Sequence, residues 1–191
     1  MTLHLSGDPE ADQLLTDSPF ALLVGMVLDQ QIPLEWAFSG PRRMQERLGG
    51  NLDVDQIATM DPDELAKVFS SRPALHRFPG ANAKRVQALA QVIVDEYDGQ
   101  AERIWTTAKT GNELYRRIKA LPGFGDQKAR IFIALLGKQL DVRPGGWEEA
   151  SEPYGAPGTT MSVADITGPA SLVDVREYKR LKKAALKADD E

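Results

Sequence analysis

The chain has 191 residues, 42% of them hydrophobic and 27% charged, with a formal net charge of −5 at pH 7. This length suffices for one domain with a substantial core, or for two small lobes that share one. The absence of cysteine excludes disulfides, a cysteine-ligated iron–sulfur cluster and a cysteine nucleophile, and the two histidines argue against a histidine-built metal site. Residues 1–12 do not resemble a signal peptide, and no apolar run approaches membrane-spanning length. We therefore expect a soluble cytoplasmic protein with no membrane partner.

Helical patterns fill the first half of the chain, and no segment has a convincing strand pattern. Residues 1–16 are expected to form a separate N-terminal segment with a frayed start. A core helix is predicted from Pro19 to about Gln31, because nearly all of its first ten residues are apolar. The next predicted helix runs from Pro33 towards Gly49, with an interruption at Gly40-Pro41.

Two further helices precede the middle of the chain. Asp61 and Pro62 are typical of a helix start, and the residues after them carry an apolar stripe. Asn82 is predicted to cap the following helix, on which Lys84 and Arg85 face away from the apolar positions.

The most informative segment is Leu121-Pro122-Gly123-Phe124-Gly125, which lies between two predicted helices. Before it, Thr110 and Glu113 have capping-box spacing. After it, a strongly apolar run predicts a buried helix that ends at Gly137. The order of parts is that of a helix-hairpin-helix.

The composition of this hairpin indicates a clamp for a DNA backbone. Gly123 and Gly125 allow a tight turn and leave no Cβ between the backbone amides and a ligand. The free N–H groups of the second helix suit a phosphate, and Lys128 and Arg130 add positive charge. The alternative is an ordinary tight turn in which the glycines serve only the backbone geometry.

The net negative charge argues mildly against nucleic-acid binding, but the distribution of charge matters more. Bases gather at Arg72–Arg85, Lys128–Lys138 and Arg176–Lys187, which predicts one basic face on an acidic body. The last cluster is equally typical of a solvated helix face. Residues 143–160, rich in glycine and proline, are predicted to be a loop or lid, and residues 173–188 a basic helix.

The order of these parts resembles the helix-hairpin-helix-GPD (HhH-GPD) superfamily of base-excision DNA glycosylases, which includes endonuclease III and the alkyladenine glycosylases. The resemblance covers roughly residues 17–150, and the hairpin is its most specific match. It implies an all-α, two-lobed helical bundle, here without an iron–sulfur cluster. We expect a monomer in which the segment 151–191, a loop and a basic helix, packs on the same domain.

The resemblance also implies contacts with double-stranded DNA. The segment Met26–Ile32 is similar to a glutamine-containing turn, so Gln31 would enter the base stack as the target nucleotide leaves it. Without the resemblance, two glutamines at a helix end would be read as solvated. The backbone carbonyls of Leu121 and Gly123 are expected to bind a sodium or potassium ion. The residues expected to contact DNA are Gln31, Lys84, Arg85, Gly123, Gly125, Gln127, Lys128 and Arg130.

This chain departs from the family at the position of the lysine nucleophile. Bifunctional members carry that lysine two residues after the last hairpin glycine, where this chain has Gln127. Lys128 lies about 100° further around the helix. We therefore expect no strand cleavage by a lyase mechanism.

A second departure concerns the catalytic acid. The family places an aspartate in the loop after the buried helix, where this chain has Arg143 or Pro144. Asp141 is the nearest carboxylate and is predicted to be catalytic, with Glu148 and Glu149 as alternatives. For each, an exposed surface carboxylate is the competing interpretation.

Trp147 has two interpretations in the same loop. It is predicted to line the base pocket and stack on a flipped base. Alternatively, it packs the loop onto the core.

Three functions remain open at this point. The first is a monofunctional DNA glycosylase that hydrolyses the N-glycosidic bond of a damaged or mismatched base. The second is a non-catalytic protein of the same fold that binds a DNA lesion or structure, and the third is a helical protein-interaction module. Salt-sensitive binding that depends on Gly123 and Gly125 would exclude the third, and base release would separate the first from the second.

Overall fold

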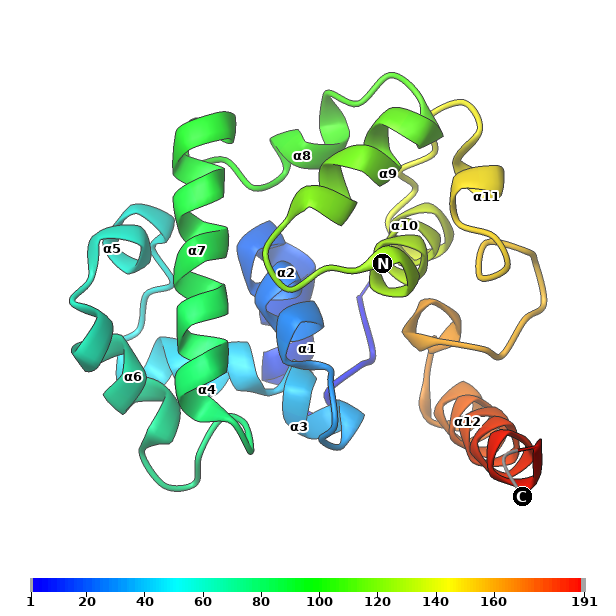
Figure 1. Cartoon of the computed structure of the whole chain (residues 1–191), viewed down its shortest axis with the longest axis horizontal. Coiled ribbons are helices and arrows are strands. Elements are labelled where there is room, and N and C mark those ends of the chain that lie inside the picture. Colours follow the sequence, from blue (N-terminus) through cyan, green and yellow to red (C-terminus); the bar gives the residue numbers. More distant parts are fainter. Residues whose placement is uncertain (1, 190–191) are drawn as a thin grey trace.

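The computed structural model describes residues 2–189 and, in the last helix, the side chains up to residue 185. Within these residues all regular structure is helical, apart from one isolated bridge between Thr110 and Gly145, which confirms the predicted all-α fold (Figure 1). The elements are α1 (Pro9–Asp17), α2 (Pro19–Leu28), α3 (Leu34–Phe38), α4 (Gly40–Arg47), α5 (Val54–Thr59), α6 (Pro62–Ser70), α7 (Pro79–Tyr97), α8 (Arg103–Thr106), α9 (Gly111–Ala120), α10 (Asp126–Gln139), α11 (Trp147–Ala150), the 3-10 turn η1 (Val163–Asp165) and α12 (Pro169–Asp189).

Helix α2 lies at the centre of the molecule, and all its residues after Pro19 are buried. Its start is capped by Ser18, whose hydroxyl accepts a hydrogen bond from the N–H of Ala21 at 3.2 Å. Helices α1, α3, α4 and α7 pack on it, and α5 and α6 pack on α7. A second group forms around α10, with α9, α11 and η1 against it (Figure 1). One hydrophobic core, from Leu3 to Val175, joins the two lobes.

The N-terminal segment belongs to this core, which corrects the expectation of a frayed start. Leu3 and Leu5 are 1% and 0% exposed. The buried Asp12 carboxylate accepts a hydrogen bond from the N–H of Leu5 at 2.9 Å and so holds the segment against α1. The short, polar helix α1 was not predicted, because its apolar face has few residues.

Helix boundaries differ from the prediction where tertiary contacts decide them. Helix α2 ends at Leu28, and the predicted helix from Pro33 is divided into α3 and α4 at the expected interruption. Helix α7 begins at Pro79, so Asn82 lies within its first turn. Helix α10 continues through Gly137, where a Cβ would overlap the ring of Trp147. This glycine therefore serves packing and does not end the helix.

The segment 143–160 is packed rather than open, since Ser151 and Tyr154 are buried. Helix α12 follows and is anchored by the buried Val175 and by an ion pair of Arg176 with Glu35 on α3. From Leu181 to residue 185 all side chains are exposed. The side chain of Lys187, the end of the predicted basic cluster, lies outside the described residues. No single helix in residues 2–189 meets the length and hydropathy needed to cross a membrane, although α1 and α2, bent by 116°, do so when joined.

Candidate nucleic-acid interface

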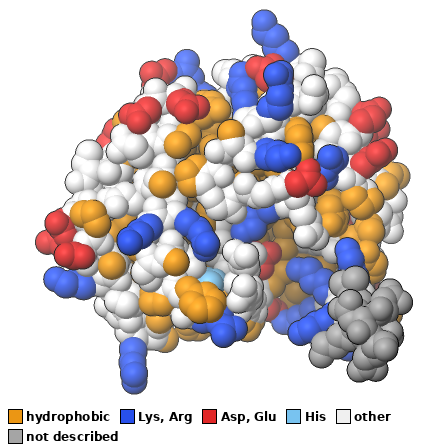
Figure 2. Space-filling model, in the orientation of Figure 1, with side chains coloured by type: hydrophobic (Ala, Val, Ile, Leu, Met, Phe, Trp, Pro, Cys, Tyr) orange, Lys and Arg blue, Asp and Glu red, His pale blue; other side chains and the backbone are white. Residues whose placement is uncertain are grey.

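A cleft of about 630 Å³ lies between the turn after α2, the start of α10 and one face of α12. Lys and Arg side chains gather around this hollow in Figure 2. Tyr154 and Met161, from the segment between α11 and η1, complete the wall. The lining is otherwise mostly polar or charged and includes Asp29, Gln30, Gln31, Gly123, Gly125, Asp126, Gln127, Lys128, Tyr178, Lys179 and Lys182.

The hairpin turn lies directly against α2. Gly123 has a φ of 85°, and a Cβ at this position would lie 3.1 Å from the Val27 side chain. The backbone conformation therefore favours glycine, and a Cβ would in addition crowd the Val27 side chain. Leu121 and Phe124 are buried and anchor the two sides of the turn. The predicted tight turn is present, and its contact with α2 fixes where α10 begins.

Gly125 meets a different environment. It is the N-cap of α10, no described side chain caps the helix start, and no described atom lies within 4 Å of the Cβ position. The first N–H groups of α10 thus belong to residues that line the cleft and lack helical partners. Gln127 donates a hydrogen bond to the Tyr154 hydroxyl at 2.9 Å, which orients its amide along the wall.

Lys128 extends from α10 to the end of α2. Its ammonium donates a hydrogen bond to the Val27 carbonyl at 3.3 Å. Burial lowers the pKa of Lys128 to about 8; the Asp29 carboxylate opposes this shift, and Arg85 adds to it. The lysine is thus a partly desolvated cation that faces the cleft.

Asp29 is the C-cap of α2, and its carboxylate lines the same cleft and acts electrostatically on Lys128. Burial raises its pKa, whereas Lys179 and Lys128 lower it. No described residue donates a hydrogen bond that would lower the pKa of the Asp29 carboxylate. Sequence reasoning missed Asp29, because its importance depends on α10 and α12, which lie far along the chain.

A buried histidine fixes the turn that follows. His76 is 3% exposed, and its Nε2–H donates to the Gln30 carbonyl at 2.8 Å. Its Nδ1 accepts from the Phe78 N–H at 3.0 Å and from the Asn82 amide at 2.8 Å. This set of partners corresponds to the neutral imidazole, and burial lowers the pKa of His76 accordingly. His76 therefore positions the turn through a contact between residues 46 apart in sequence.

Gln31 lies at the tip of this turn and is exposed at the rim of the cleft. Its φ of 60° is unusual for a residue other than glycine. Backbone strain of this kind persists where the surrounding structure imposes it, and it gathers at functional sites. Here the hydrogen bond from His76 to Gln30 supplies the constraint.

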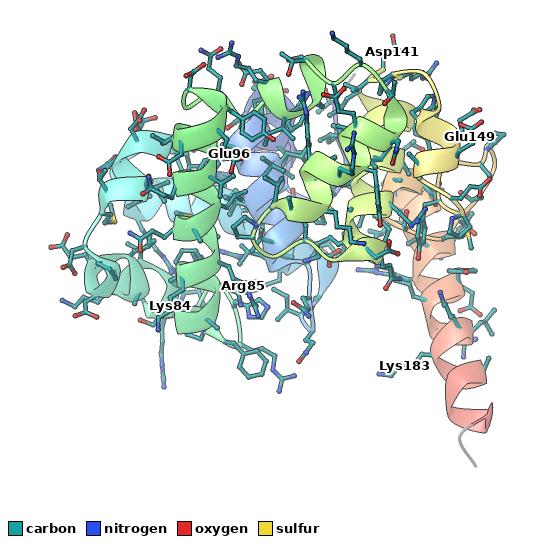
Figure 3. All side chains as sticks on the ribbon, turned by 45° about the horizontal axis from the view of Figure 1, so that its top comes forward. Lys84, Arg85, Glu96, Asp141, Glu149 and Lys183 are labelled. Atoms are coloured by element: carbon teal, nitrogen blue, oxygen red, sulfur yellow. The ribbon has the colours of Figure 1, made fainter. Side chains whose placement is uncertain are left out.

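The predicted catalytic carboxylates lie elsewhere. The Asp141 side chain is 87% exposed and pairs with Arg143 at 3.4 Å. Glu148 and Glu149 are exposed on α11, and Glu149 lines a separate depression. Figure 3 shows Asp141 and Glu149 at the opposite end of the molecule from Lys183. The cause is the docking of this loop on α9, where the Gly145 carbonyl accepts from the Gly111 N–H at 2.8 Å.

The structure also places Trp147 and Arg130, both predicted to contact DNA, outside the cleft lining. The Trp147 ring covers Gly137 on α10 and does not line the cleft, so the structure supports the packing interpretation. Arg130 pairs with Asp126 at 3.2 Å and donates to the Ala150 carbonyl at 3.5 Å. Both side chains stabilise the face of α10 that points away from the cleft.

The remaining predicted DNA contacts, Lys84 and Arg85, are exposed near the start of α7 (Figure 3). Neither lines the cleft, but Arg85 is close enough to lower the pKa of Lys128. Helix α12 adds Lys179 and Lys182 to the lining, which assigns part of the predicted basic cluster to the cleft wall. Among the side chains that the structure describes, no cluster of three or more histidine or acidic groups is arranged to hold a metal ion.

Comparison with known families identifies the fold. Residues 24–187 match the model of HhH-GPD superfamily base excision DNA repair proteins. The match confirms the resemblance and extends it beyond residue 150 to include α12, which forms one wall of the cleft. Searches of curated proteins and of solved structures return no significant match. With most of its length in that match and the hairpin at the cleft, the chain belongs to the HhH-GPD superfamily of base-excision DNA repair proteins.

Proposed function

We propose that this protein is a monofunctional DNA glycosylase that hydrolyses the N-glycosidic bond of a damaged or mismatched base in double-stranded DNA. The observation that carries the proposal is that three features meet at one cleft: the open start of α10, the Gln31 turn with its positive φ, and the charged side chains of Asp29 and Lys128 in the lining. Base excision requires a grip on the backbone, a residue that replaces the extruded nucleotide, and charge placed at the sugar.

The backbone grip comes from the hairpin and its surroundings. A phosphate oxygen at Gly125 would meet the free N–H groups of α10 and no side chain. Lys128, Lys179 and Lys182 surround the same space. This local excess of positive charge opposes the net charge of −5.

Extrusion would be served by the turn after α2 and its neighbour at the start of α7. Gln31 fills the gap in the duplex, supported by His76. Phe78 is a large apolar side chain that is 47% exposed beside His76, with their ring centroids 6.0 Å apart. Apolar side chains in such positions unstack base steps. The cleft volume is within the usual range for pockets that hold small organic groups.

The hairpin carbonyls fit the cation that the family implies. The Leu121 carbonyl accepts one hydrogen bond, from the Phe124 N–H at 3.1 Å, and retains a second lone pair. Gly123 is exposed. A monovalent ion held by these two carbonyls would add positive charge beside the phosphate.

A second candidate function has its own supporting observation. Arg143 or Pro144 stands where the family places its loop aspartate, and the Arg143 side chain donates to the Gly137 carbonyl at 2.8 Å. A chain without that acid in the cleft is also suited to recognise a lesion without excising it. Specific DNA binding without base release would favour this function.

The test is a panel of duplexes, each with one damaged or mismatched base, incubated with the purified protein and then treated with alkali. We expect strand breaks that appear only after alkali, which reveal abasic sites. Breaks before alkali would contradict the absence of lyase activity. No release from any duplex would contradict the glycosylase, and binding that is insensitive to salt would contradict DNA recognition altogether.

A further inference from the structure

The cleft contains few acidic groups that could act on a sugar. Its described lining includes two carboxylates, Asp29 and Asp126. Asp126 is occupied, because it accepts from the Tyr115 hydroxyl and pairs with Arg130 at 3.2 Å and Lys119 at 3.8 Å. These partners lower the pKa of Asp126, the Tyr115 hydrogen bond most of all. Asp126 is therefore held as a structural anion at the start of α10.

We propose that Asp29 is the catalytic carboxylate of this protein and acts from the end of α2, in place of the loop aspartate that the chain lacks. The inference rests on the proposed glycosylase function and names the residue that performs it. Its geometric basis is that Asp29 lines the cleft two residues before Gln31. The extruded nucleotide and the carboxylate would thus be positioned by a single turn.

The surroundings of Asp29 suit a group that acts on water or on a cationic sugar. Its carboxylate is half-buried between the lysines of α10 and α12. Lys128 is tied to the Val27 carbonyl, two residues before Asp29, which holds this cation close to the carboxylate. Burial raises the pKa of Asp29, which makes it a better proton acceptor than a solvated aspartate.

The proposed reaction is a hydrolysis that consumes one water molecule. The bond between C1′ and the base nitrogen breaks, and its electron pair leaves with the base. The positive charge that develops on the sugar is stabilised by the Asp29 carboxylate. A water oxygen then bonds to C1′ while its proton passes to Asp29, and Asp29 returns a proton to the departed base.

The first experiment measures single-turnover base release from the duplex that the wild type processes. Asp29→Asn removes the charge and keeps the volume, and we expect its rate to fall by about 10²- to 10³-fold. Asp141→Asn and Glu149→Gln are matched controls on the far side of α10 and should retain the wild-type rate. A cooperative thermal unfolding transition would establish that each variant is folded. Wild-type rates in folded Asp29→Asn would overturn the inference and leave the glycosylase function standing.

The second experiment does not depend on turnover. Affinity is measured for two duplexes that differ at one sugar, a cationic pyrrolidine in one and a neutral tetrahydrofuran in the other. A carboxylate at the sugar favours the cation by about 10- to 100-fold in the wild type, the range of a charge-assisted hydrogen bond. Asp29→Asn should remove this preference, whereas Asp141→Asn should keep it. An equal preference in wild type and Asp29→Asn overturns the assignment, even if no natural substrate is found.

Discussion

The two faces of α10 carry similar kinds of residue in opposite circumstances. On the cleft face, Lys128 makes one hydrogen bond, to a backbone carbonyl, and Gly125 borders open space. On the far face, Arg130 is held by a carboxylate and by carbonyls, Gly137 is covered by Trp147, and Arg143 is bonded to the backbone.

This difference separates residues that stabilise the protein from residues available to a ligand. Polar groups on the far face find their partners within the chain, as buried polar groups generally do. On the cleft side, Lys128 and Asp29 are partly desolvated without complete pairing, a state that costs stability and that functional sites retain. The loop 141–149 belongs to the far face, because Arg143 is bonded to the Gly137 carbonyl, Asp141 pairs with Arg143, and Trp147 covers Gly137.

The largest expected effect on DNA affinity comes from Gly125→Glu, which places a carboxylate where a phosphate would lie. We expect DNA affinity to fall by about 100-fold through charge repulsion and loss of space. The free energy of unfolding should change by less than about 0.5 kcal/mol, since no described atom lies within 4 Å of the Cβ position. Fluorescence anisotropy at fixed salt and thermal unfolding measure the two quantities.

Gly145→Glu is the matched control for this change. Gly145 also has no described atom within 4 Å of its Cβ position, but it borders the depression on the far face. Its DNA affinity should remain within about twofold of the wild type. Equal weakening by both variants would remove the distinction between the two faces.

Gly137→Ala should break the far face instead. The added Cβ overlaps the Trp147 ring, and overpacking of this kind lowers the free energy of unfolding by about 2 kcal/mol. DNA affinity per folded molecule should be unchanged. Gly80→Ala on α7 makes the same substitution in open space and should be neutral or stabilising by about 0.5 kcal/mol. A stable Gly137→Ala that bound DNA poorly would assign a ligand role to this face.

Lys128→Met tests the cost of the cleft cation. We expect about fivefold weaker DNA binding at pH 7 and a reduction of about one in the salt slope, the signature of one phosphate contact. Stability should increase by about 1 kcal/mol, because the desolvated charge is gone.

The gain from Lys128→Met depends on pH in a defined direction. The pKa of Lys128 falls from 10.5 to about 8 on folding, so between these values the unfolded chain binds a proton that the folded chain lacks. Wild-type stability therefore rises relative to the variant as pH increases from 8 to 10.5. The stabilisation by Lys128→Met is therefore largest below pH 8 and decreases as pH rises towards 10.5. Thermal unfolding at pH 7 and 10 distinguishes this result from a pH-independent packing effect.

The smallest effect is expected for Asp141→Asn, together with Glu148→Gln. Both side chains are exposed on the far side of α10, so base release should stay within twofold of the wild type and the free energy of unfolding within about 0.5 kcal/mol. A tenfold loss of base release in Asp141→Asn would return catalysis to the loop and contradict the comparison.

Local sequence was a good guide wherever a structure depends on neighbouring residues. The predicted helix starts at Pro19, Asp61 and Thr110 are present, and Gly123 produces the turn with its positive φ. The predicted end of α10 was wrong, because Gly137 has the sequence signature of a helix end. In the structure it lies within the helix and makes room for the Trp147 ring. The role of Leu3 and Leu5 was missed for the same reason, since their burial depends on residues distant in sequence.

The candidate site also combines features set by local sequence with features set by the tertiary structure. The amino-acid sequence by itself determined the all-α fold and the hairpin, because glycines, caps and apolar periodicity act over a few residues. Gln31 became a candidate insertion residue only through the family resemblance. Only the tertiary structure decided which charges share the cleft: Asp29, Lys128 and Lys179 come from α2, α10 and α12. Desolvation and charge coupling depend on distance in space and not on distance along the chain. Asp141, which is near the expected acid position in sequence, lies outside the cleft, whereas Asp29 lies within it.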